Sequence, residues 1–282
     1  MRLTSCFAVF GGGLIFLATP GGVVESANLS NRASISADRS TIGRRCHAMT
    51  ENFSVFSFVG GPDAEKLGRR AEELRRQLRE RWLDGTHHAT WPVRCQVVVH
   101  GSRTSYSHSV GRGAAQTKGS SLIRTSGGEV SFRRLDLMAD GEAEPSALAH
   151  ELSHVVLADH FRGNQPPRWA DEGIALLSDC DHKQSLHRRD GMNALYRGEQ
   201  LPLVEILTSQ ELRDPTRIGA FYGQSLMLVE LLVRRHGSNV FFAFLETASQ
   251  AGYDLALRQC YGLNGIAELE SVWREEVLGS RS

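Results

Sequence analysis

The sequence predicts an α+β fold, with a small N-terminal mixed α/β lobe that contains a sheet and a mainly helical lobe after it. Strand-like segments concentrate between residues 53 and 137, whereas apolar residues recur at three- and four-residue steps after residue 144. Hydrophobic residues make up 41% of the 282 residues and charged residues 23%, which is typical of a chain that buries a core. We divide it into residues 51–140 and 141–282 and expect the two parts to form one domain.

The first 26 residues have the pattern of a signal peptide. Arg2 supplies a positive charge, residues 6–18 form a short apolar run, and Val24 and Ser26 fit the rule for residues that precede cleavage. The run is too short to span a bilayer as a mature helix, although an uncleaved anchor is the alternative. We therefore expect a secreted, periplasmic or cell-envelope protein with no membrane span after cleavage, in which residues 27–50 form an N-terminal lead.

A strand and a helix open the first lobe. Apolar and small residues alternate over residues 53–59, which indicates a strand. Pro62 and Asp63 then begin a helix whose apolar residues recur at helical spacing, namely Leu67, Ala71, Leu74, Leu78 and Trp82. The remaining face mixes glutamates with arginines, which predicts a solvated face rather than a basic groove. These arginines are Arg69, Arg70, Arg75, Arg76, Arg79 and Arg81.

Two further strands are predicted at residues 95–100 and 129–137. The Gly- and Ser-rich stretch between residues 111 and 128 predicts a flexible loop, because Lys118-Gly119-Ser120 does not have the order of a phosphate-binding loop. An extended peptide could add to the strand at 129–137 if that strand is a sheet edge. Arg133 and Arg134 would then flank the cleft, with solvent-facing arginines as the alternative.

The second lobe is predicted to contain helices near residues 145–159, 168–180, 219–236, 239–249 and 264–278. Pro145 suits a first helical turn, where its missing amide is not needed. Gly237 follows three basic residues and lies where a helix C-terminal cap is expected.

The segment His150-Glu151-Leu152-Ser153-His154 carries the strongest chemical signal. Residues four apart lie one turn above each other on a helix, so both imidazoles can reach one cation. Glu151 is rotated by about 100° from His150, beside the metal, where it can act as a general base on metal-bound water. The alternative is a helix with two histidines that bind nothing.

A catalytic zinc site needs a third protein ligand, and two residues compete for this role. Glu172 lies eighteen residues after His154, in a segment that can form a second helix packed against the first. His160 has the spacing of a longer zinc motif, but Leu157 stands where that motif has the glycine that turns the backbone. Glu172 is the favoured ligand.

His150–His154 followed by Trp169-Ala170-Asp171-Glu172-Gly173-Ile174-Ala175 resembles the gluzincin metallopeptidases, especially the peptidase-MA-like exported bacterial proteins. The resemblance covers roughly residues 50–278, including Tyr222-Gly223-Gln224-Ser225 and Trp273, although its sharp motifs occupy only 150–154 and 169–175. It implies Zn²⁺ held by His150, His154 and Glu172, with Glu151 as the base. Two family motifs are missing. No G-x-M-E-N segment precedes the helix, and Leu176 occupies the aspartate place of E-x-x-x-D. An endopeptidase is therefore favoured over an aminopeptidase.

Several residues are candidates for supporting roles. A second electrophile beside the metal would stabilise the oxyanion, and the resemblance makes Tyr222 the first candidate, ahead of His182 and His187. A buried core tyrosine is the alternative. Asp171 could accept a proton from a ligand imidazole or only cap its helix. Trp169 is expected to pack between the two zinc-binding helices.

We expect an exported zinc-dependent peptidase that acts on a peptide or protein substrate. A catalytically inactive, zinc-stabilised binding or envelope protein is the alternative, and a metal-free helical interaction domain is a third. The 32 basic and 32 acidic residues balance, which argues against a nucleic-acid partner. Four cysteines follow the signal peptide and could form two disulfides of open pairing, namely Cys46, Cys95, Cys180 and Cys260.

Overall fold

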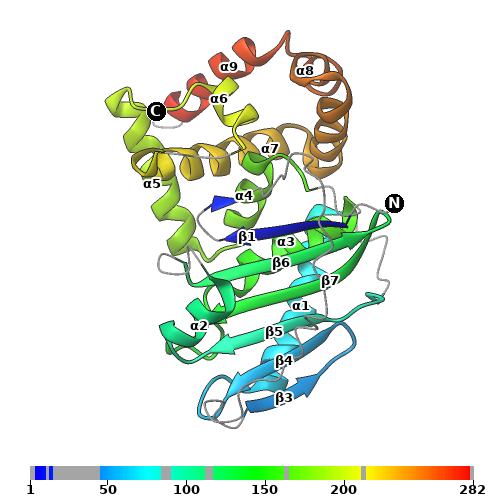
Figure 1. Ribbon diagram of the computed structural model, residues 1–282. Coiled ribbons are helices and arrows are strands. Elements are labelled where there is room, and N and C mark those ends of the chain that lie inside the picture. The colour runs from blue at the N-terminus through cyan, green and yellow to red at the C-terminus, as the bar shows by residue number, and fades with distance from the viewer. Residues whose placement is uncertain are drawn as a thin grey trace, which may run out of the picture.

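A mixed seven-stranded sheet forms the N-terminal part of the described chain (Figure 1). The structure is a computed structural model that describes residues 4–10, 13–14, 45–83, 90–111, 117–161, 165–210 and 214–279. The strand order is β2-β1-β6-β7-β5-β4-β3, in which β4, β5 and β7 are mutually parallel and the other pairings antiparallel. The strands are β1 (Thr4–Phe10), β2 (Gly13–Leu14), β3 (Arg45–Met49), β4 (Phe53–Phe58), β5 (Cys95–His100), β6 (Gly119–Ser126) and β7 (Glu129–Met138).

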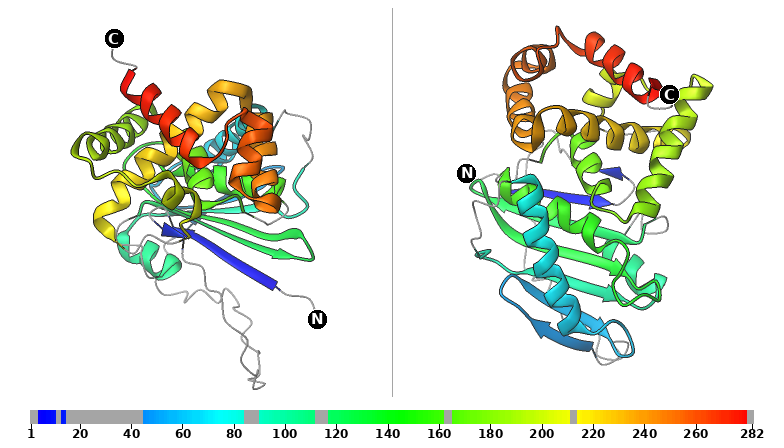
Figure 2. Two further views of the ribbon diagram at one scale, coloured as in Figure 1. Left: turned by 90° about the horizontal axis from the view of Figure 1, so that it is seen from above. Right: turned by 180° about the vertical axis from the view of Figure 1, so that it is seen from behind.

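Helices cover both faces of this sheet. Helix α1 (Ala64–Trp82) and helix α3 (Leu148–His160) lie on one face, and the short helix α2 (Arg103–Val110) lies on the other (Figures 1 and 2). Helix α1 begins where the sequence predicts, because the Asp63 side chain caps it by accepting a hydrogen bond from the Lys66 amide. Its predicted apolar residues are all buried against the sheet. The mixed sheet and its helices give the α+β architecture that the sequence predicts.

The predicted solvated face of α1 is wrong for two of its arginines. Arg75 and Arg79 are each 6% exposed. The Arg75 guanidinium lies 4.4 Å from the centre of the Trp91 ring, and Arg79 Nη1 lies 3.7 Å from Asp159 Oδ2. The aliphatic stems of these arginines follow the apolar stripe into the core, and the aromatic ring and the carboxylate receive their charged ends.

The loop prediction for residues 111–128 is also wrong in part. Residues 119–126 form β6, while 112–116 lie outside the described residues. Strand β7 is therefore not a sheet edge, because β6 pairs with one side of it and β5 with the other. Arg133 is 1% exposed and forms an ion pair with Asp159, so it does not flank a cleft. Small residues at the start of β6 conceal the strand, because they carry little β propensity.

Only part of the predicted signal peptide lies within the described residues. Residues 4–10, which belong to the predicted signal peptide, form β1 and pair antiparallel with β6. Residues 15–44, which include most of the predicted cleavage region and lead, lie outside the described residues. The signal peptide stays a prediction.

The second half of the described chain is helical. Its helices are α4 (Arg168–Leu176), α5 (Asp181–Arg197), α6 (Leu203–Thr208), η1 (Pro215–Arg217), α7 (Ile218–Ala251), α8 (Tyr253–Tyr261) and α9 (Ile266–Gly279). Gly237, with φ of 82°, interrupts α7 where the sequence predicts a helix end. The pattern of apolar residues does not predict helices α5, α6 and α8. Figure 2 shows that α7, α8 and α9 gather beyond one edge of the sheet.

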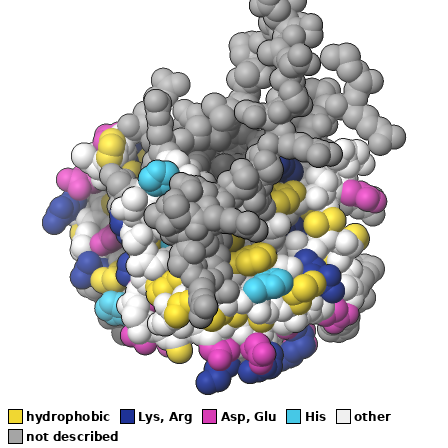
Figure 3. Space-filling model, turned by 60° about the horizontal axis from the view of Figure 1, so that its bottom comes forward, with side chains coloured by type: hydrophobic (Ala, Val, Ile, Leu, Met, Phe, Trp, Pro, Cys, Tyr) yellow, Lys and Arg dark blue, Asp and Glu magenta, His cyan; other side chains and the backbone are white. Residues whose placement is uncertain are grey.

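One hydrophobic core connects the two parts, from Phe53 in β4 to Trp273 in α9. All four cysteines that could have formed disulfides are unpaired. Among the described helices, none has the length and apolar character needed to cross a bilayer. On the face that Figure 3 presents, acidic and basic side chains lie close together along the rim, with hydrophobic side chains between them.

Candidate metal centre

Helix α3 places His150 and His154 on one face, as the sequence predicts. The helix lies between the sheet and α4, so its residues 150–158 are all buried or nearly so. The two imidazole rings have their centroids 5.1 Å apart and planes inclined by 76°. The spacing of one helical turn thus brings both rings toward a common point.

Helix α4 brings Glu172 to the same point. The glutamate is fully buried, and its Oε2 lies 3.7 Å from His150 Nε2, which is too long for a hydrogen bond. The neighbouring Gly173 allows this approach. A Cβ on Gly173 would lie 2.7 Å from the backbone oxygen of Ser225 in α7, so only glycine lets α4 pack this closely. One donor atom from each of His150, His154 and Glu172 lies within 4.8 Å of the others.

The three residues fit a metal ion because their facing atoms lack partners. The Nε2 atoms of His150 and His154 and both carboxylate oxygens of Glu172 are buried without a hydrogen bond. Each such atom costs about 1–3 kcal/mol when it is left unsatisfied. A single cation coordinated by all three side chains would satisfy the imidazole nitrogens and the carboxylate together. Two imidazoles and one carboxylate are donors that suit a divalent transition metal.

Two aspartates hold the far sides of the imidazoles. Asp179 Oδ2 lies 3.0 Å from His150 Nδ1 in a hydrogen bond, and Asp171 Oδ1 lies 2.9 Å from His154 Nδ1. Burial opposes ionisation of Asp179, but His150 and Lys183 outweigh it and lower the pKa of its carboxyl. An ionised Asp179 on His150 Nδ1 leaves the Nε2 of this imidazole free to bind a cation. Asp171 lies close enough to His154 for the first of its two predicted roles, although its oxygens and His154 Nδ1 form no hydrogen bond in this arrangement.

Asp179 is the site residue that the sequence analysis missed. The expected second carboxylate is four residues after the ligand, where Leu176 stands, and Asp179 is seven residues after it. It lies just beyond the end of α4, where the chain turns into α5. Helical spacing gives no signal for a residue in such a turn, so only the fold reveals its contact with His150.

Glu151 faces the cavity beside the three candidate ligands. The cavity has a volume of about 340 Å³, and Glu151 lines it together with His150, Glu172 and Tyr222. Glu151 is 1% exposed, and its Oε2 has no hydrogen-bond partner. A Cβ on Gly119 at the start of β6 would lie 2.6 Å from Glu151 Cγ, so this glycine leaves room for the carboxylate. Burial raises the pKa of Glu151 despite the opposing charges of the histidines.

Tyr222 of α7 and His187 of α5 line the same cavity as Glu151. The Tyr222 hydroxyl is buried without a partner, and burial raises the pKa of this phenol above its ordinary value. Tyr222 is therefore a neutral hydrogen-bond donor at the cavity. Burial lowers the pKa of His187, whose ring centroid lies 5.9 Å from that of Tyr222. His182 is exposed and does not line the cavity.

His160 and Trp169, which the sequence analysis also singled out, do not line the cavity. His160 lies exposed at the end of α3, beside the rings of Phe161 and Phe242, and is not among the grouped ligands. Trp169 of α4 is fully buried, and its ring packs against Phe241 and Phe244 of α7. The tryptophan thus fixes α4 to α7.

Neither a scan against models of protein families nor a search of curated proteins finds a match. The function must therefore be inferred from the chemistry of the cavity.

Proposed function

We propose that the protein is an exported zinc-dependent peptidase with a zincin-like fold. The observation that carries this proposal is the position of Glu151. Its buried carboxylate, which has a partnerless oxygen, lines the same cavity as His150 and Glu172, two of the three side chains whose donor atoms fit a metal ion. Such an arrangement places a base beside an open coordination position, as hydrolysis of a peptide bond requires.

His150, His154 and Glu172 would hold the ion. Zinc bound there would act as a Lewis acid that polarises a carbonyl and lowers the pKa of a bound water to about 7. Glu151 accepts the proton of the attacking water at its carboxylate and then returns it to the departing amine nitrogen. Its raised pKa suits both steps, because the base must hold the proton before it gives it back.

Tyr222 is the residue we propose to stabilise the oxyanion. Its hydroxyl is a buried donor without a partner, and Tyr222 lines the same cavity as Glu151. A neutral donor in a site shielded from water stabilises developing negative charge without prior reorganisation. His187 lines the same cavity and is the second candidate for this role.

The substrate would be an extended peptide paired with β6. Gly119 begins this strand and contacts Glu151, and the strand's outer side is paired with residues 4–10. Those residues belong to the predicted signal peptide, so its cleavage would leave β6 as an edge. Backbone hydrogen bonds to an edge strand hold a peptide without regard to its side chains. An endopeptidase fits this mode better than an aminopeptidase.

A zinc-stabilised binding protein without activity is the alternative. Structural zinc sites usually have four protein ligands, whereas the group found in the described residues has three. A buried glutamate with an unsatisfied oxygen beside the site would serve no purpose in such a protein. The peptidase therefore accounts for more of the cavity.

The deciding experiment compares Glu151→Gln with Glu199→Gln, an identical change at an exposed residue. Hydrolysis of a peptide library by zinc-loaded protein should fall by about 100-fold or more in Glu151→Gln, because the base is lost. The zinc content should stay at wild-type level, and Glu199→Gln should cleave normally. Equal cleavage by the two variants would exclude Glu151 as the base. Zinc binding without cleavage in the wild type would favour the binding protein.

A further inference from the structure

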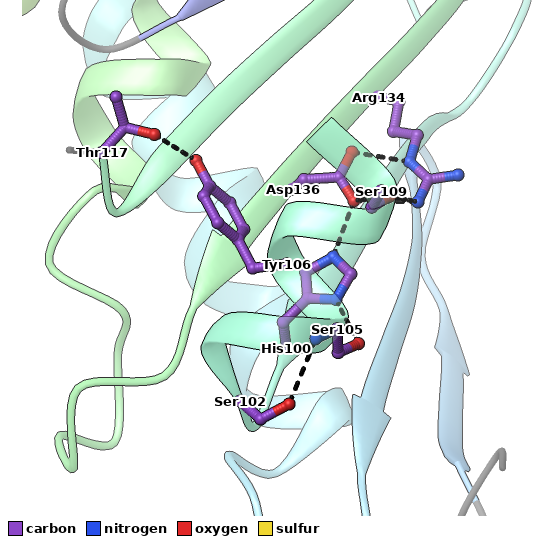
Figure 4. A network of polar contacts seen from close by, with 8 residues as sticks. All are labelled: His100, Ser102, Ser105, Tyr106, Ser109, Thr117, Arg134 and Asp136. Atoms are coloured by element: carbon purple, nitrogen blue, oxygen red, sulfur yellow. Dashed lines mark hydrogen bonds and ion pairs between the residues drawn. The ribbon is translucent and has the colours of Figure 1, made fainter. Parts of the chain in front are cut away.

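A second polar cluster lies away from the cavity. In it, hydrogen bonds link a serine to a histidine and the histidine to an aspartate (Figure 4). His100 ends β5, Ser105 lies in α2 and Asp136 lies in β7. The Ser105 Oγ lies 2.8 Å from His100 Nδ1, and the His100 Nε2 lies 2.7 Å from Asp136 Oδ1. A nucleophile bonded to a base that a third group orients is the signature of an activated hydroxyl.

This cluster lies across the sheet from the candidate metal centre. Asp136 pairs with Ser120 of β6, whereas the adjacent Gly119 faces Glu151. Successive residues of a strand point to opposite faces, so Asp136 and Glu151 are separated by the sheet. Helix α2 packs on the face opposite α3, as Figure 2 shows. Any chemistry at this cluster is therefore independent of the proposed metal.

The aspartate fixes which imidazole nitrogen carries the proton. Asp136 accepts hydrogen bonds from Ser109 Oγ and from the Arg134 guanidinium as well as from His100. Burial opposes its ionisation, but these contacts outweigh it and lower the pKa of Asp136 to about 2. An ionised Asp136 requires a proton on His100 Nε2. The lone pair of neutral His100 is then on Nδ1, where it accepts the Ser105 hydroxyl proton.

The cluster differs from an enclosed structural network because one end reaches solvent. His100 is 3% exposed and Asp136 5%, but Ser105 is exposed. The ring of the fully buried Tyr106 packs edge-on to His100, with centroids 5.7 Å apart, and holds the imidazole in place. Ser105 also lies in the first turn of α2, where the helix dipole favours negative charge.

We propose that Ser105 is a nucleophile that takes acyl groups from small activated carboxylic esters. Ser105 Oγ attacks the ester carbonyl carbon while its proton passes to His100 Nδ1. The bond to the leaving alkoxide then breaks, and the alkoxide receives that proton. Water, deprotonated by His100, cleaves the resulting serine ester and restores the hydroxyl. The donor must be small and activated, because Ser105 is exposed on a short helix and its own amide already donates to Ser102 Oγ, which leaves the other first-turn amides of α2 to stabilise the oxyanion.

A fluorophosphonate reporter tests the nucleophile in the full chain. Its phosphorus reacts with activated serine hydroxyls and expels fluoride. Peptide mapping of the wild type should place the adduct on Ser105, with labelling about 100-fold or more faster than at Ser107 of the same helix. Ser105→Ala should lose the adduct, whereas Ser107→Ala, its matched control, should keep it. Labelling should persist in a chelator, which separates this site from the proposed peptidase centre.

Hydrolysis of p-nitrophenyl acetate supplies a second readout. The wild type should release nitrophenolate in a burst that leaves an acetyl group on Ser105, and Ser105→Ala should lack the burst. Equal labelling of Ser105 and Ser107, or an unchanged burst in Ser105→Ala, would overturn the proposal. Both substituted serines are partly or fully exposed, so neither variant is expected to unfold.

Discussion

The two buried histidine clusters, one on each side of the sheet, differ in whether the protein itself supplies a partner for every imidazole nitrogen. In the candidate metal centre, His150 and His154 each have one nitrogen near an aspartate and one without a partner. In the other cluster, both nitrogens of His100 are bonded, one to Asp136 and one to Ser105. The first cluster needs a ligand to satisfy its buried atoms, whereas the second is complete within the protein.

A buried carboxylate–histidine pair therefore does not by itself reveal its chemistry. In both clusters an aspartate orients an imidazole, and the free nitrogen decides the outcome. Where several free nitrogens and a carboxylate converge, a cation is the group that satisfies them. Where a solvent-exposed hydroxyl is hydrogen-bonded to the other imidazole nitrogen, the carboxylate–histidine pair can take the proton of that hydroxyl. The comparison can be tested by removing one group from either side.

The largest expected effect is at the proposed third ligand. Glu172→Ala should weaken zinc binding by more than about 100-fold, because loss of a direct ligand exceeds the usual cost of losing an orienting group. His160→Ala is the matched control, since His160 had the competing motif spacing and should leave affinity unchanged. Equilibrium dialysis against a chromogenic chelator measures both. A weaker affinity in His160→Ala alone would reverse the ligand assignment.

A smaller effect is expected at Asp179. Asp179→Asn keeps the side-chain shape but removes the charge that orients His150, so zinc affinity should fall about 10- to 100-fold. Asp181→Asn, two residues away and exposed, should bind zinc as the wild type does. If both variants retain full affinity, Asp179 does not position the ligand.

The smallest effect is expected on stability at Asp136. The pKa of its carboxyl is lowered from 3.8 to about 2, which corresponds to about 2 kcal/mol of stability at neutral pH. This contribution is present above pH 4 and is lost as the pH falls toward 2, because the unfolded chain then binds the proton first. Asp136→Asn should lose it at all pH values. Urea unfolding at pH 7 and pH 3 measures the difference.

Asp136→Asn also tests whether the two clusters are independent of each other. Its zinc content should equal that of the wild type, because the sheet separates Asp136 from the metal centre. A loss of zinc binding in this variant would show that the two clusters are coupled. Stability that falls with pH in parallel for variant and wild type would contradict the assigned pKa.

Local pattern predicted those parts of the site that lie within one element. The four-residue spacing of His150 and His154 fixes their shared face on α3, and the segment around Glu172 is a helix as expected. The pattern failed where a tertiary contact determines the outcome. The small residues at the start of β6 predict a loop because they have little strand propensity, whereas the close approach of Glu151 explains why Gly119 stands there.

The α+β class, the helix that carries the two histidines and Glu172 as the favoured third ligand could all be predicted from the sequence. Only the tertiary structure decided that Asp179 orients His150, that Arg75 is buried, and that Ser105 meets His100 and Asp136. The physical reason is that helical and strand periods specify which face a residue occupies. Which distant residue that face meets depends on how the packed elements fit together, and no period along the chain encodes this.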